Sequence, residues 1–234
     1  TTGVENTLLG ANSGDALTDT DGNVAVGTYA LSTDTLGARA VAVGHSALLT
    51  QNFTTATNNY NVGVGHQAGR AVTTGSLNTL VGGLAGLALT SGNNNTALGY
   101  AALSSDTLGD RNVAIGIQAL GAQNFTTSTD SYNTAVGFTA GASITTGTLN
   151  TLIGGLAADA LTSGNSNVAL GYVSLSADTL GDRAVALGYG ALNQQNFATT
   201  TDNYNVGVGY SAGLSITTGQ SNTLIGGNAG DALQ

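Results

Sequence analysis

The residues of this chain that could do chemistry are few, and they do not suggest a catalytic group. The only two histidines, His45 and His66, each follow directly after the glycine of a short recurring motif. Other copies of the motif carry Tyr or Phe at that place, so the histidines are predicted to replace aromatic residues in a ladder. A metal site would need further ligands. The sequence contains no Cys, which excludes disulfides, thiolate metal sites and thiol chemistry.

The carboxylates are predicted to be structural. The stretch 19–23 (Asp-Thr-Asp-Gly-Asn) is similar to the start of a calcium loop but lacks the distal Glu, so a plain turn is expected. Three aspartates each precede an arginine by five residues. They are expected to form surface ion pairs, worth at most ~1 kcal/mol, that join a turn to the next strand or to a neighbouring chain. The pairs are Asp34 with Arg39, Asp106 with Arg111, and Asp178 with Arg183.

Nucleotides, nucleic acids and membranes are not predicted partners. The stretches 63–68 and 207–212 fit the letters of a dinucleotide-binding fingerprint, but both are ordinary copies of the repeat with no helix expected after them. Thirteen acidic against four basic residues give a net charge of −9, which disfavours binding to phosphate backbones or anionic lipids. No apolar run approaches the roughly 18 residues of a membrane span.

The whole chain is built from a short repeat. Its core is Asn, then Val or Thr, a small residue or Leu, an aliphatic residue and Gly. Successive copies are 17 residues apart, except that one step in four is 21 residues, so three steps of 17 and one of 21 make a longer period of 72. The closing glycines stand at 10, 27, 44, 65, 82, 99, 116, 137, 154, 171, 188, 209 and 226.

Each period is predicted to form one coil of a parallel β-solenoid, which makes the chain all-β. The motif alternates with the period of two that strands require, and the intervening Thr, Ser, Gly, Asp and Asn are typical of turns. Seventeen residues are too few for two packed helices, and the absence of Pro suits a continuous ladder. We expect one domain, 1–234, with super-repeats 1–72, 73–144 and 145–216 and a further coil 217–234, cut from a longer chain.

Asparagine opens eleven of the thirteen motifs, and Ala40 and Ala184 are the exceptions. Because buried polar groups are hydrogen-bonded, these side chains are predicted to form a structural ladder between coils. The predicted ladder includes Asn23, Asn61, Asn78, Asn95, Asn112, Asn133, Asn150, Asn167, Asn205 and Asn222.

Both faces of the predicted strand are apolar. Motif positions 2 and 4 share one face, and position 3, which is always Ala, Gly or Leu, lies on the other. One face is expected to fill the coil and the other to pack against neighbouring chains, as in a homotrimer. The prediction places position 4 inside, so Val136→Asp is expected to bury an unpaired charge and disrupt folding.

The repeat resembles two families of fibrous proteins. Copies such as 95–103 (Asn-Thr-Ala-Leu-Gly-Tyr-Ala-Ala-Leu) are similar to the tandem repeats of phage tail fibres. The Val-Ala-Val-Gly form resembles the head repeats of trimeric autotransporter adhesins, which build a left-handed β-roll trimer. The resemblance covers essentially the whole chain and implies a trimeric fibre that is extracellular or part of a virion. The regular 21-residue coil departs from both families.

The three long coils carry three of the four Phe residues of the chain, together with Tyr, among Asn, Thr and Asp. Such aromatic residues either cover the base of their own loop, pack between chains or bind a glycan. The candidate receptor-binding residues are Phe53, Tyr60, Phe125, Tyr132, Phe197 and Tyr204.

These features lead to a main functional hypothesis and several alternatives. The chain is interpreted as a rigid fibre segment of a phage tail fibre or bacterial adhesin, with a cell-surface glycan or protein as its receptor. Alternatively, matching first and last coils and the lack of polar caps suggest a filament that stacks end to end. An ice-binding solenoid is disfavoured because the Thr array is incomplete. No enzyme activity and no cofactor are expected, since a glycan-cleaving site needs paired carboxylates and Glu5 is the only Glu.

Overall fold

A computed structural model describes residues 3–233, and every regular element in that range is a β-strand. The strands form a parallel β-solenoid of about 13 turns, which confirms the fold class predicted from the repeat. The chain divides into two compact units, Thr1–Asn112 with Asn124–Asp130, and Val113–Gln123 with Ser131–Gln234. Each unit is described by itself.

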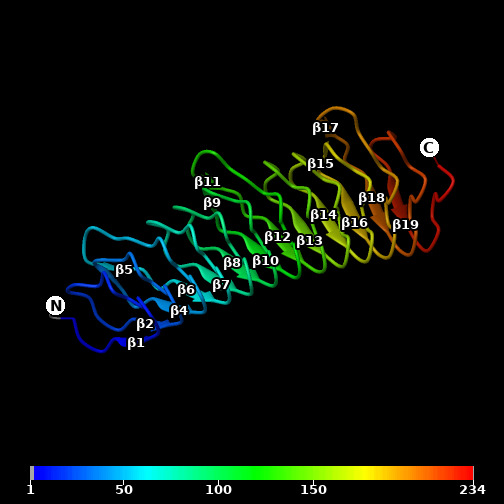
Figure 1. The fold of residues 1–234 in the computed structure, drawn as a ribbon. Helices are drawn as coiled ribbons and strands as arrows, with labels where there is room; N and C mark the ends of the chain where they lie inside the picture. The colour runs from blue at the N-terminus through cyan, green and yellow to red at the C-terminus, as the bar shows by residue number, and fades with distance from the viewer. Residues whose placement is uncertain (1–2, 234) are drawn as a thin grey trace. The chain divides into compact units, whose positions relative to one another are not determined.

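In the first unit, three-residue strands lie next to one another in chain order in a parallel sheet (Figure 1). The register pairs each motif position with the same position one coil later, as Val24 pairs with Val41. The strands are β1 (Thr7–Leu9), β2 (Val24–Val26), β4 (Val41–Val43), β6 (Val62–Val64), β7 (Thr79–Val81) and β8 (Thr96–Leu98). Short parallel pairs join β3 (Gly37–Ala38) to β5 (Thr57–Asn58) and β9 (Gly109–Asp110) to β11 (Thr129–Asp130).

The second unit repeats this arrangement. Its strands also pair motif position with motif position, as Val168 pairs with Val185. They are β10 (Val113–Ile115), β12 (Thr134–Val136), β13 (Thr151–Ile153), β14 (Val168–Leu170), β16 (Val185–Leu187), β18 (Val206–Val208) and β19 (Thr223–Ile225). A two-residue pair joins β15 (Gly181–Asp182) to β17 (Thr201–Asp202) at the base of a long coil.

Motif position 3 points into each coil. Ala25 and Leu80 in the first unit and Ala135 and Leu152 in the second have no exposed surface. Position 4 lies outside, and Val136 is only half-buried, so the prediction that placed position 4 inside is wrong. The physical reason is the small cross-section of a 17-residue coil, because small side chains let the opposite wall of the coil approach.

The side chains inside a coil compensate one another in size. Leu80 at position 3 is matched by Gly86 six residues later, where an added Cβ would lie 2.8 Å from Leu80 Cδ2. In the next coil the order is reversed, with Ala97 at position 3 and Leu103 six residues later, and both are fully buried. Since protein interiors are close-packed, this exchange keeps the combined size of the two positions similar in these two coils. Where both positions hold Gly, as at Gly63 and Gly69, Leu side chains of the neighbouring coils occupy the space.

The closing glycine of the motif is required for two reasons. Its φ is +135° at Gly65 and +134° at Gly154, and residues other than Gly avoid this backbone conformation. In addition, a Cβ at Gly65 would lie 2.6 Å from the carbonyl group of Gly82, and one at Gly154 would lie 2.5 Å from the carbonyl oxygen of Gly171. Successive coils therefore touch backbone to backbone at this glycine.

Two adjacent substitutions test which face is inside. Ala135→Asp is expected to lower the free energy of unfolding by about 3 kcal/mol or more, because it buries a charge without a partner. Val136→Asp keeps its carboxylate in water and is expected to fold. Circular dichroism of the two purified variants should show the β-sheet signal for Val136→Asp and its loss for Ala135→Asp. The reverse result would contradict the assignment of position 3 to the interior.

Candidate functional site

The motif asparagines form a ladder of hydrogen bonds inside each unit. The backbone N–H of Asn95 donates to Oδ1 of Asn78 at 3.0 Å, and Nδ2 of Asn78 donates to the carbonyl oxygen of Gly92 at 2.8 Å. In the second unit, the N–H of Asn167 donates to Oδ1 of Asn150 at 2.9 Å. The Asn78 amide thus joins its own coil to the next at two points, and its buried polar atoms are hydrogen-bonded.

Where the ladder lacks an asparagine, the long coil supplies one. The N–H of Ala40 still donates to Oδ1 of Asn23 at 2.8 Å, but Ala40 offers no side-chain acceptor to the coil that follows. The motif of that coil begins at Asn61, whose N–H donates instead to Oδ1 of Asn59, 2.9 Å away in the inserted loop. Asn59 has no exposed surface. It therefore replaces the missing rung.

The same replacement recurs in the third long coil. Ala184 stands where Ala40 does, and the N–H of Asn205 donates to Oδ1 of Asn203 at 2.9 Å. The middle super-repeat has the opposite choice, with Asn112 opening the motif and Ser131 in the loop. Sequence reasoning missed Asn59 and Asn203, although this exchange between two positions of the repeat was the available signal.

Asp34 is buried and serves the long coil, so the predicted pair with Arg39 is wrong. Its Oδ1 accepts hydrogen bonds from the N–H groups of Gly37 (3.0 Å) and Phe53 (3.1 Å). Its Oδ2 accepts from Nε2 of Gln51 at 2.5 Å, and Gln51 in turn accepts from Nδ2 of Asn61. The carboxylate therefore holds the beginning of the inserted loop, where backbone donors need an acceptor.

Asp178 holds the third long coil in the same way. It accepts from Nε2 of Gln195 at 2.6 Å and from the N–H of Gly181 at 3.0 Å. Burial raises the pKa of the Asp178 carboxyl, and the hydrogen bond from Gln195 lowers it by a smaller amount. Because the folded-state pKa lies above the unfolded value, this group favours the folded state at low pH. That contribution is lost as the pH rises through the folded-state pKa.

The arginines pair elsewhere than predicted. Arg111 forms an ion pair with Asp130, and Arg183 forms one with Asp202, and these side chains are about half exposed. Asp106, the predicted partner of Arg111, has no exposed surface and accepts a hydrogen bond from the N–H of Gly109. The ion pairs predicted from the five-residue spacing are wrong because each of these aspartates occupies an interior position of its coil.

The candidate receptor-binding residues separate into two groups. The three phenylalanines are only 4–7% exposed, so they support their own loops and offer no surface to a receptor. The three tyrosines are 47–54% exposed. Arg39 lies 5.6 Å from the centre of the Tyr60 ring, and Arg183 lies 5.7 Å from that of Tyr204, as in cation–π contacts. The buried residues are Phe53, Phe125 and Phe197, and the exposed ones are Tyr60, Tyr132 and Tyr204.

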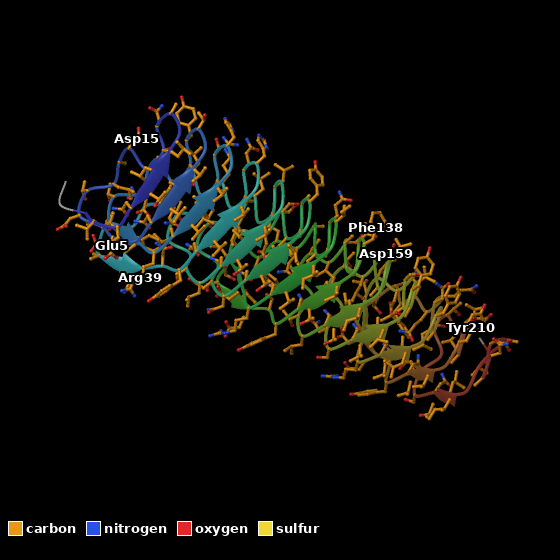
Figure 2. All side chains as sticks on the ribbon, turned by 90° about the horizontal axis from the view of Figure 1, so that it is seen from below. Glu5, Asp15, Arg39, Phe138, Asp159 and Tyr210 are labelled. Carbon is orange, nitrogen blue, oxygen red and sulfur yellow. The ribbon has the colours of Figure 1, made fainter. Side chains whose placement is uncertain are left out.

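An aromatic ladder follows the closing glycines, as predicted from the positions of the histidines. His45 and His66 stack with their ring centres 5.4 Å apart. Tyr189 stacks on Tyr172 at 5.7 Å and on Tyr210 at 5.2 Å. Figure 2 shows Phe138 and Tyr210 on the same edge of the second unit. Within residues 3–233, no group of three or more His, Cys, Asp or Glu side chains is placed to hold a metal ion.

The outer sheet face, defined as the side chains at motif positions 2 and 4, is an apolar surface on each unit. It consists of Val, Leu, Ile and Thr alone and carries no charge. Leu98 in the first unit is 46% exposed, and Leu170 in the second is 47% exposed. Contiguous exposed apolar surface of this kind is typical of a surface that binds a protein.

Comparison with family models, with curated proteins and with solved structures found no match to this chain. Among the described residues, no helix is long and apolar enough to cross a membrane. The resemblance to fibre repeats therefore remains a prediction from the motif.

An exchange of rungs tests the asparagine ladder. Asn59→Ala removes the acceptor of the Asn61 N–H and is expected to lower the free energy of unfolding by about 1–3 kcal/mol. Adding Ala40→Asn places an amide where the middle super-repeat has Asn112 and is expected to restore most of the loss. Thermal unfolding of the single and double variants measures both effects. A double variant no more stable than Asn59→Ala would show that the two positions do not share one role.

Proposed function

We propose that this chain is a structural segment of an extracellular fibre, of the kind found in phage tail fibres and bacterial surface adhesins. In this proposal, copies of the chain associate side by side through the outer sheet face, as a homotrimer. The exposed tyrosines of the long coils, Tyr60, Tyr132 and Tyr204, are then candidate contacts to a receptor. The observation that carries the proposal is the uncharged apolar outer sheet face.

The chemistry of the outer sheet face supports association with a surface of the same kind. Its side chains recur at the strand spacing of about 4.8 Å, so a second copy presents the same row at the same spacing. Branched aliphatic residues such as Val168 and Leu170 lose little conformational entropy when packed. Burying them against another copy removes apolar area from water, at about 25 cal/mol per Å².

The solenoid construction supports the spacer role. Backbone hydrogen bonds join each coil to the next, and the asparagine amides add side-chain bonds at every rung that holds one. Local bending would break several of these bonds together. In this proposal, the stiffness of each unit lets it act as a spacer that holds receptor contacts at a fixed distance from an anchor.

Light scattering on a size-exclusion column tests the association. The unmodified chain is expected to run near three times its monomer mass of 22.9 kDa. Leu170→Asp places a charge on the outer sheet face and is expected to give a folded monomer.

The matched control is Leu214→Asp in the same unit. Leu214 is half-buried away from the sheet, and the corresponding position three coils earlier already holds an aspartate, Asp159. This variant is expected to remain trimeric. An unmodified chain that is monomeric at all concentrations would refute the proposal, and open-ended species would favour end-to-end filaments instead.

A further inference from the structure

The first long coil of the first unit has a pocket beside its inserted loop. The pocket has a volume of about 260 Å³. Its lining includes Asp19, Asp21, Ala38, Arg39 and Asn58. Figure 2 shows Arg39 and Glu5 on one edge of the unit, and Asp15 on the opposite edge. We infer that this pocket binds a neutral saccharide.

The pocket is open because Ala38 stands where the other super-repeats have an aspartate. In the middle super-repeat, Asp110 fills this position, and its Oδ1 accepts from the N–H of Asn93 at 2.6 Å. Its Oδ2 accepts from the hydroxyl of Ser128 at 2.9 Å, so the carboxylate joins the inserted loop to the neighbouring coil. Ala38 ends at Cβ and cannot make these bonds, which leaves the space between loop and coil accessible.

A second substitution frees hydrogen-bonding groups at the same place. Asn58 replaces the aspartate that pairs with arginine in the other super-repeats, where Arg111 binds Asp130. Within residues 3–233, Arg39 donates instead to the Tyr60 hydroxyl at 2.5 Å and forms no ion pair. A guanidinium has five N–H donors, so most of those on Arg39 remain for a ligand, as does the Asn58 amide.

The lining selects a neutral, hydroxyl-rich ligand. The Oδ1 atom of Asp21 already accepts from the N–H of Val4 at 2.7 Å, so its Oδ2 is the acceptor offered to a ligand hydroxyl, while Arg39 and Asn58 donate to hydroxyl groups. Leu36, Ala38 and Ala56 also line the pocket and give apolar surface to the C–H face of a sugar ring. Two carboxylates repel an anionic ligand. Pockets for drug-sized ligands start at about 300 Å³, so this smaller pocket suits a single sugar residue.

Saturation-transfer NMR on the full chain tests the inference. The probes are the methyl glycosides of galactose, glucose, mannose and N-acetylglucosamine, with EDTA present so that binding through a metal ion does not contribute. At least one glycoside is expected to bind with a Kd on the order of 1 mM, the range for a ligand of this size. Sialyllactose, which is anionic, is expected to bind at least tenfold more weakly through its sialic acid.

Variants that copy the middle super-repeat locate the site. The triple variant Asp21→Asn, Ala38→Asp, Asn58→Asp installs the residues found at 93, 110 and 130, so it should fold and lose at least tenfold in affinity. Asp202→Asn, at the position of the third super-repeat that corresponds to Asn58, is the matched control and should bind as the unmodified chain does.

No signal from any glycoside, or equal binding by the triple variant, would overturn the inference. All residues of the pocket belong to one chain, so saccharide binding does not require self-association. Light scattering on the same samples therefore tests the proposed trimer independently of the pocket.

Discussion

The fold depends on the contact between the closing glycines of successive motifs. At Gly137 an added Cβ would lie 2.4 Å from the carbonyl oxygen of Gly154, so no other residue fits. This contact sets how closely two coils approach and which residues face each other. The asparagine hydrogen bonds, the inward direction of position 3 and the exposure of positions 2 and 4 all follow from that register. The same constraint that stacks the coils therefore creates the apolar surface through which we propose that copies of the chain associate.

The long coils show how the solenoid accepts an insertion. Four extra residues interrupt the regular ladder, and buried polar side chains replace what is lost. Asp34 and Gln51 bind the base of the loop, and Asn59 provides the missing rung. Because these groups are satisfied inside, the loop surface is free to vary between super-repeats. The saccharide pocket that we infer arises from such variation. Only the first super-repeat has Ala, Ala38, at the position where the other two have Asp.

The repeat period, the strand core, the asparagine ladder and the aromatic ladder could be predicted from the sequence, since each depends on local spacing. The inward face could not, because Ala135 and Val136 are both apolar, and alternation alone does not say which side of the strand faces the narrow interior. The partners of Asp34 could not be predicted either, because the spacing of residues does not show that the Asp34 side chain is buried inside the coil. The pocket required side chains from three segments of the chain.

The most direct test of this account is calorimetric unfolding of Gly154→Ala beside Gly226→Ala. Both glycines have φ near +130°, but an added Cβ meets the Gly171 carbonyl oxygen at 2.5 Å in the first case and nothing nearer than 4.0 Å in the second. We predict that Gly154→Ala lowers the Tm by at least about 5 °C more than Gly226→Ala, from overpacking between coils. Equal Tm values for the two variants would contradict the claim that the glycine contact sets how closely successive coils approach.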